Sequence, residues 1–210
     1  MGNHQPKSRA ELASLLEVIG LSIECVEILI GVGAAESRTF SRAAPLAASE
    51  YMRWARMVEH FQLESTAQGL GWLRYNPQNL PVFVHPKTQI GLVISSGDEY
   101  TGVSFANPST RNPKGTSFAR TIDPDGQLAF FGTLDDEAEM IEVSDMRVLL
   151  YQERGGLVFT ELSRPSIVHA GRIVAWDDRV IFPAFDVSAN RFVIDDGDTE
   201  ADFTFTIARR

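Results

Sequence analysis

The chain has 210 residues, of which 44% are hydrophobic and 22% charged, and it contains a single cysteine. This composition excludes a largely disordered chain and an internal disulfide, and it favours a protein with a packed core in a reducing compartment, the cytoplasm. The formal net charge of -9 is unevenly distributed along the chain. Residues 1–122 contain 11 Lys or Arg and 10 Asp or Glu, whereas residues 123–210 contain 8 Lys or Arg and 18 Asp or Glu. An anionic partner is therefore expected to contact the first 122 residues.

The first predicted helix begins at Ser8. Residues 8–11 read Ser-Arg-Ala-Glu, a capping box in which the serine hydroxyl accepts from the glutamate amide and the glutamate carboxylate accepts from the serine amide. Across residues 12–30, apolar residues recur every three or four positions, so they share one face of the helix. Gly31 and Gly33 are predicted to end it.

The apolar run from Val18 to Ala35 is the segment most easily mistaken for a membrane span. It contains Glu24 and Glu27, and a charged residue at the centre of a membrane helix costs about 3 kcal/mol on insertion scales. We therefore expect no membrane partner.

A second helix is predicted from about Pro45 to Glu64, with apolar residues again spaced by three and four. Two amphipathic helices in succession predict either a protein partner or self-association through these helices, or packing on the chain's own β-domain. The pattern covers too few heptads for a long coiled coil.

Residues 65–81 mix Gly and Pro with apolar anchors and read as a connector, after which the period changes from helical to alternating. The sequence thus predicts a helical region with connector at 1–75 and a β-rich domain at 76–210. The fold class expected is α+β: two N-terminal amphipathic helices, then a sandwich or partly open barrel of about ten short, mostly antiparallel strands. The predicted strands are 82–85, 90–95, 101–105, 117–122, 127–131, 147–152, 157–162, 172–176, 179–184, 191–194 and 202–208.

Five dipeptides are predicted to form tight turns between these strands, because Gly and Asp favour two-residue hairpin loops. They are Asp125-Gly126, Gly155-Gly156, Ala170-Gly171, Asp177-Asp178 and Asp196-Gly197.

The polar region at 95–120 is the predicted binding site. It combines basic side chains, which neutralise phosphates, with aromatic rings, which stack on bases, and with small polar residues. The candidate ligand-binding residues are Ser96, Asp98, Tyr100, Thr101, Phe105, Arg111, Lys114, Thr116, Phe118 and Arg120. They predict a non-catalytic binding or assembly protein that contacts an anionic or macromolecular partner, nucleic acid or nucleotide included; a protein-contact loop and a plain structural loop are the alternatives.

Two hydrolase or nucleotide motifs are only half met in this region. Ser95 precedes Gly97 as a nucleophile elbow requires, but Val93 stands in place of the first glycine. Residues 114–116 read Lys-Gly-Thr, which inverts the order of a P-loop. We therefore assign no catalytic residue, cofactor or metal from the sequence, because no motif is specific enough to identify a reaction.

Two other functions are predicted as alternatives. His85, Asp98 and Glu99 predict a metal-assisted phosphoesterase or nuclease if the hairpin brings them together. The excess of negative charge in residues 123–210 predicts an acidic protein inhibitor or scaffold.

Overall fold

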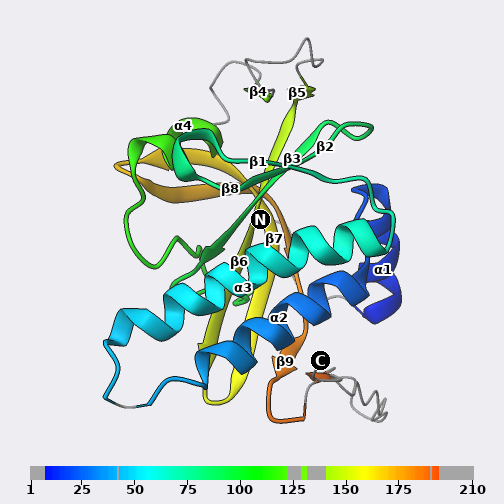
Figure 1. The fold of residues 1–210 in the computed structure, drawn as a ribbon. Coiled ribbons are helices and arrows are strands. Elements are labelled where there is room, and N and C mark those ends of the chain that lie inside the picture. The colour runs from blue at the N-terminus through cyan, green and yellow to red at the C-terminus, as the bar shows by residue number, and fades with distance from the viewer. Residues whose placement is uncertain (1–7, 42, 123–128, 132–140, 190, 194–210) are drawn as a thin grey trace.

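A computed structural model describes residues 8–41, 43–122, 129–131, 141–189 and 191–193 of the chain. Its helices cover the two faces of one mixed sheet, and α2 and α3 run side by side across one of these faces (Figure 1). The helices are α1 (Arg9–Val18), α2 (Ile23–Ser37), α3 (Leu46–Ala67) and α4 (Thr116–Ile122), with a short 3-10 turn at Pro77–Asn79. Within the described ranges, none of the helices has the length and apolar character needed to cross a bilayer.

The predicted capping box at the start of α1 is confirmed. The Ser8 hydroxyl accepts a hydrogen bond from the Glu11 amide, and the Ser8 amide donates to the Glu11 carboxylate at 2.9 Å. Two backbone groups that the first helical turn leaves without partners are thereby satisfied.

The first predicted helix is wrong in its extent, because it is divided into α1 and α2 by a turn at Gly20. Gly20 has φ +78°, and a Cβ at this position would lie 2.8 Å from the imidazole ring of His85. Only glycine fits both the left-handed backbone and this close contact. The Ser22 hydroxyl then caps α2 by accepting from the Cys25 amide at 3.0 Å.

The prediction that Gly31 and Gly33 end the helix is also wrong, because α2 continues to Ser37. A Cβ on Gly33 would lie 2.7 Å from Cγ of Met57 in α3. This glycine lets α2 and α3 approach closely, which is a packing role and not a terminating one.

The apolar faces of the N-terminal helices are buried within the chain. Leu12, Leu16 and Leu29 have no exposed surface and share one core cluster with sheet residues such as Phe83 and Leu149. Packing on the chain's own sheet is what the structure shows, and self-association through these helices stays a prediction.

The β-strands form an open mixed sheet, so the α+β class is confirmed while the sandwich or barrel is wrong. Their order is β1-β2-β3-β6-β7-β9-β10, with β8 also paired to β7; β3 and β6 are parallel and every other pair is antiparallel. A separate two-stranded sheet joins β4 and β5. The strands are β1 (Leu73–Tyr75), β2 (Val82–His85), β3 (Ile90–Ser96), β4 (Ala129–Phe131), β5 (Ile141–Val143), β6 (Asp145–Arg154), β7 (Leu157–His169), β8 (Arg172–Ile181), β9 (Ala184–Asp186) and β10 (Arg191–Val193).

The sheet has a core on each face because successive side chains point to opposite sides. Along β2, Phe83 joins the core beneath the N-terminal helices, whereas Val82 and Val84 join a second core. Phe118 and Ile122 of α4 cover this second core. The chain therefore passes from one face of the sheet to the other between β3 and α4.

Several local predictions differ from the structure. Residues 101–105 form turns, residues 117–122 belong to α4, and residues 172–181 form the single strand β8, which contains Asp177-Asp178. The strand predicted over residues 117–122 is wrong because this segment buries two apolar side chains one helical turn apart against the second core.

Two of the predicted hairpin turns are confirmed. Gly155-Gly156 joins β6 to β7, and Ala170-Gly171 joins β7 to β8. All four of these residues have positive φ, as the tight two-residue hairpin loop requires. The predicted turns at 125–126 and 196–197 and the predicted strand at 202–208 lie outside the described residues.

Candidate ligand-binding pocket

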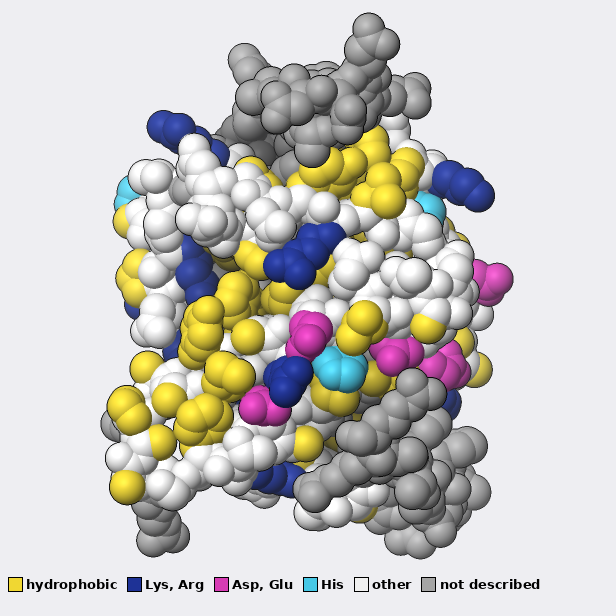
Figure 2. All heavy atoms as spheres, in the orientation of Figure 1, with side chains coloured by type: hydrophobic (Ala, Val, Ile, Leu, Met, Phe, Trp, Pro, Cys, Tyr) yellow, Lys and Arg dark blue, Asp and Glu magenta, His cyan; other side chains and the backbone are white. Residues whose placement is uncertain are grey.

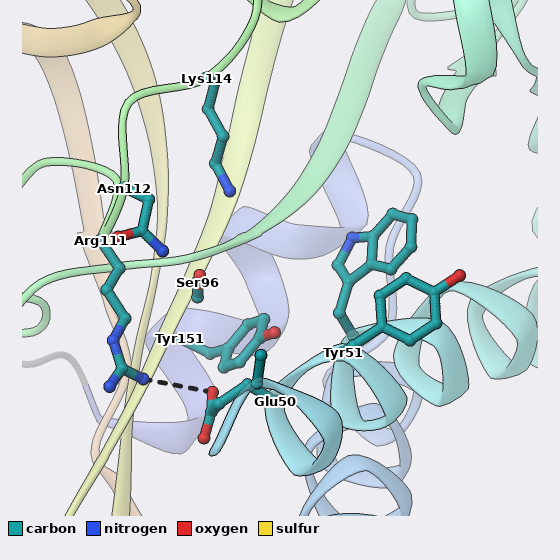
Figure 3. Close-up of a pocket in the computed structure, with 9 residues that line it drawn as sticks. Glu50, Tyr51, Ser96, Arg111, Asn112, Lys114 and Tyr151 are labelled. Atoms are coloured by element: carbon teal, nitrogen blue, oxygen red, sulfur yellow. Dashed lines mark ion pairs between the residues drawn. The ribbon is translucent and has the colours of Figure 1, made fainter. Parts of the chain in front are cut away.

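A pocket of about 570 Å³ opens between the N-terminal half of α3, the end of β3 and the loop of residues 97–115 (Figure 3). It lies at the carboxyl ends of the parallel pair β3 and β6, where Ser96 is in register with Tyr151; this is the edge at which sheets of parallel strands tend to hold ligands. Its lining residues are Ala47, Glu50, Tyr51, Trp54, Ser96, Arg111, Asn112, Lys114 and Tyr151. In Figure 2, apolar side chains gather over the N-terminal half of α3, at the lower left of the view.

The base of the loop is closed by Asp98. Its carboxylate accepts from the Tyr100 amide at 3.1 Å and from the Ser109 amide at 2.9 Å. Burial raises the pKa of Asp98, although these two backbone hydrogen bonds act in the opposite direction. Immediately after this closure, the Arg111 amide donates to the Ser96 carbonyl at 3.0 Å, which fixes the start of the segment that lines the pocket.

A buried ion pair anchors the first half of the loop to the sheet. Glu161 of β7 and Arg179 of β8 lie 2.5 Å apart and are almost without exposed surface. Arg179 also donates to the carbonyls of Val103 and Ala106, and Glu161 accepts from the Gly102 amide at 3.0 Å. Because each charge meets both its partner and backbone groups, the pair ties the loop to two strands.

The second half of the loop is held by β8 and the turn before it. The Trp176 indole donates to the Pro108 carbonyl at 2.8 Å, and Arg172 donates to the Thr110 carbonyl at 3.1 Å. The Lys114 amide donates to the Gly171 carbonyl at 2.8 Å. The backbone that carries the basic pocket residues is thus fixed by residues that follow it in the sequence by 57 to 68 positions.

Two cations line the pocket, and they differ in their partners. Arg111 forms an ion pair with Glu50 at 3.5 Å, and both side chains are partly exposed, by 49% and 37%. The Lys114 side chain extends from the loop into the cavity (Figure 3), and no ion pair joins it to a carboxylate in the described part of the chain. Burial lowers the pKa of Lys114. The pocket therefore contains a partly desolvated positive charge without an ionic partner among the described residues.

The opposite wall of the pocket is aromatic. The rings of Tyr51 and Trp54 lie 5.7 Å apart at 45°, and both belong to α3. The Trp54 indole is fixed because it donates to the Ile94 carbonyl at 3.0 Å, whereas Tyr51 is 63% exposed. Tyr151 lies between the two walls in Figure 3, and burial, with a smaller contribution from Glu50, raises its pKa. Its hydroxyl is therefore a neutral donor at physiological pH.

Three of the ten predicted site residues meet in this pocket: Ser96, Arg111 and Lys114. Two others shape the loop from within, since Asp98 closes its base and Thr101 is fully buried. The remaining five lie elsewhere.

These five are distributed over the loop surface and α4. Tyr100 and Phe105 are exposed on the loop, Phe105 by 94%. Thr116 and Arg120 are exposed on α4, whereas Phe118 is buried in the second core. The aromatic residues expected to stack on a ligand thus do not line the pocket.

The aromatic wall was missed because its residues share a helical stripe with core residues. Ala47, Tyr51 and Trp54 follow the same three-and-four spacing as Val58 and Phe61, which are buried. The spacing indicates the face of the helix, but not the point at which α3 extends beyond the edge of the sheet. No sequence signal distinguished the lining residues Glu50, Asn112 and Tyr151.

The structure does not bring together the residues of the predicted phosphoesterase. His85 pairs with Ile90 at the start of β3, and Asp98 follows the end of this strand, so roughly 25 Å separates them at the strand rise. The His85 ring contacts the Leu70 carbonyl at 2.9 Å and accepts from the Thr88 amide at 3.1 Å. The described ranges contain no group of three His, Cys, Asp or Glu placed to hold a metal ion.

Comparisons with protein-family models, with curated proteins and with solved structures gave no match to this chain.

Proposed function

We propose that the protein is a non-catalytic binding protein that holds an anionic small molecule in the pocket between α3 and the 97–115 loop. The proposal depends on the surroundings of Lys114. This cation is partly buried, projects into the pocket and has no ion pair with a described carboxylate. Taking a charged amine out of water without a partner disfavours its charged form. A bound anion would offset this cost.

Arg111 is a second cation available to the same anion. Its partner in the structure is Glu50, but the guanidinium nitrogen and the carboxylate oxygen are 3.5 Å apart and both side chains are partly exposed. Exposed ion pairs of this kind contribute only about 0–1 kcal/mol. A ligand with a full negative charge can therefore compete with Glu50 for the guanidinium.

The size and the donor groups of the pocket also favour a small anion. Its volume of about 570 Å³ falls within the roughly 300–1,000 Å³ of small-molecule sites. Lys114, Arg111, Asn112 and the hydroxyls of Ser96 and Tyr151 supply hydrogen-bond donors, and Glu50 is the single carboxylate among the lining residues. This set of groups is suited to binding negative charge.

The test is a calorimetric titration of the protein with inorganic phosphate and with pyrophosphate. We expect saturable binding at one site, and we expect Lys114→Met to weaken it by about 10-fold or more, since a hydrogen bond to a charged group contributes about 1.5–3 kcal/mol. Arg120→Met is the matched control, because Arg120 is an exposed cation on α4 outside the pocket. Equal weakening by both substitutions, or full binding by Lys114→Met, would contradict the proposal.

Binding of a macromolecule, assembly with a protein partner and the acidic inhibitor or scaffold remain predictions from the sequence. No feature of the described residues favours them over the pocket.

A further inference from the structure

We infer that the anionic ligand is a phosphorylated compound with a planar ring, of the class of nucleoside monophosphates, and that the ring contacts Tyr51 and Trp54 while the phosphate contacts Lys114 and Arg111. This inference rests on the proposed function. It goes further because it assigns the two walls of the pocket to two different parts of one ligand.

The pocket has two chemically distinct walls. Figure 3 shows Arg111, Asn112 and Lys114 on the side of the loop, the ring of Tyr51 on the side of α3, and Ser96 and Tyr151 between them. A simple inorganic anion would use only the first wall. A ligand that fills the pocket needs a negative group at one end and an apolar, planar group at the other.

The basic wall is suited to phosphate. Arg111 offers a planar guanidinium that can donate two parallel hydrogen bonds, and Lys114 offers a compact ammonium group. The Asn112 amide adds another donor on the same side of the pocket. Two cations and a neutral donor match the several oxygens and the double charge of a phosphate monoester better than the single charge of a carboxylate.

The aromatic wall is suited to a flat ring. The indole of Trp54 is held by its hydrogen bond to Ile94 and packs against the core beneath the helices, so its position is fixed. The neighbouring ring of Tyr51 is 63% exposed. Aromatic side chains stack on planar rings of any base identity, since every base has a π-face. The arrangement favours ring contact without strong base selectivity.

The experiment compares four probes by calorimetric titration: adenosine 5′-monophosphate, ribose 5-phosphate, adenosine and inorganic phosphate. We expect adenosine 5′-monophosphate to bind at least fivefold more tightly than ribose 5-phosphate, the gain that one stacked ring provides. Adenosine alone should bind weakly, because it lacks the phosphate. Tyr51→Ala should remove the advantage of the ring, so that the affinity for adenosine 5′-monophosphate falls far more than the affinity for inorganic phosphate.

Matched variants separate ring contact from general effects. Tyr51→Phe should retain the advantage of adenosine 5′-monophosphate, because it keeps the ring. Tyr100→Ala removes a partly exposed tyrosine outside the pocket and should change nothing.

The possible failures are distinguishable. If ribose 5-phosphate binds as tightly as adenosine 5′-monophosphate and Tyr51→Ala has no effect, the ring assignment is wrong while phosphate binding through Lys114 stands. If none of the phosphorylated probes binds in a Lys114-dependent way, both this inference and the proposed function are wrong.

Discussion

The backbone of Lys114 is fastened to Gly171 in the turn between β7 and β8. The Lys114 amide donates to the Gly171 carbonyl at 2.8 Å, and a Cβ on Gly171 would overlap the Lys114 carbonyl oxygen. Gly171 also has φ +73°. A glycine 57 positions away in the sequence thus determines where the basic side chain enters the pocket.

This relationship predicts that Gly171→Ala displaces Lys114. The substitution should destabilise the protein by more than the roughly 1–2 kcal/mol of a left-handed backbone, because the new Cβ also overlaps the Lys114 carbonyl, and it should weaken phosphate binding about 10-fold. Gly156→Ala is the matched control, because Gly156 occupies the same place in the β6–β7 hairpin with φ +85°, and a Cβ added there would have no neighbouring atom within 4 Å. It should lose only the roughly 1–2 kcal/mol of the left-handed backbone, less than Gly171→Ala, and should keep full affinity. Denaturant unfolding and calorimetric titration give the two quantities, and equal losses of affinity in both variants would count against this role of Gly171.

Replacing Lys114 should not reduce the stability of the ligand-free protein. Burial lowers the pKa of Lys114, so below that pKa the folded state bears a desolvated charge that the unfolded state keeps in water. Lys114→Met should leave Tm unchanged or raise it by up to about 3 °C at pH 7, because 1 kcal/mol corresponds to about 2–4 °C in a chain of this size.

The pH dependence of this difference has a fixed sign. Between the lowered pKa of Lys114 in the folded protein and the ordinary lysine pKa, the unfolded state binds more protons than the folded state. The wild-type protein therefore gains stability relative to the variant as the pH rises through this range. Thermal unfolding at pH 7 and pH 10 measures this change. A variant that is several degrees less stable at pH 7 would show that the ammonium stabilises the ligand-free fold.

Glu50 should weaken anion binding through its ion pair with Arg111. Glu50→Gln removes the competing carboxylate and a nearby negative charge, so the affinity for inorganic phosphate should rise by up to about fivefold, which corresponds to the roughly 1 kcal/mol upper range of an exposed ion pair. Glu59→Gln, on the same helix but outside the pocket, should leave the affinity unchanged. A weaker affinity in the Glu50 variant would mean that the carboxylate supports the ligand instead of competing with it.

The buried pair of Glu161 and Arg179 should be the most sensitive polar contact beneath the loop. Glu161→Gln leaves a buried guanidinium without its counter-charge, which costs about 3–5 kcal/mol. Asp177→Asn is the control. Asp177 lies on β8, as Arg179 does, but its ion pair with Arg164 is exposed, so its loss should cost less than about 1 kcal/mol. Urea unfolding of both variants tests the contrast. Similar small losses in the two would show that the pair does not anchor the loop.

Cys25 should be unreactive in the folded protein. Burial, with nearby Glu64 and Glu24, raises the pKa of its thiol to about 12. Because the thiolate is the reactive form, Ellman's reagent at pH 8 should label Cys25 only after unfolding in urea. The raised pKa also makes the free energy of unfolding depend on pH. The contribution of Cys25 to stability is fully present below the ordinary thiol pKa. It declines as the pH rises from that value towards about 12, because over this range only the unfolded state releases the thiol proton. Rapid labelling of the native protein would contradict this burial.

The features that the sequence predicted well are local. The capping box at residues 8–11 and the hairpin turns at 155–156 and 170–171 depend on residues within a few positions of one another. The pairing of α2 with α3 through Gly33 and the buried pair of Glu161 with Arg179 depend on distant partners. A glycine in a helix or a charge in a strand does not reveal which distant residue it contacts.

The candidate site was predicted on its basic side and missed on its aromatic side. Arg111 and Lys114 were found because basic side chains in a polar loop can neutralise the charge of a phosphate. Tyr51 and Trp54 were assigned to packing, because their spacing continues that of buried residues in α3. Only the position of α3 over the end of β3 shows that its first turns face a pocket.

The most direct test of the account is a lysine-selective NMR titration. The chain has only three lysines, Lys7, Lys87 and Lys114, so the spectrum of Lys114→Met assigns the relevant side-chain signal. We predict that Lys114 titrates below the ordinary lysine pKa in the free protein. Saturating inorganic phosphate should shift the Lys114 signal and raise its pKa, while the signals of the other two lysines stay unchanged. A Lys114 signal and pKa that stay the same at saturating phosphate would contradict anion binding at Lys114.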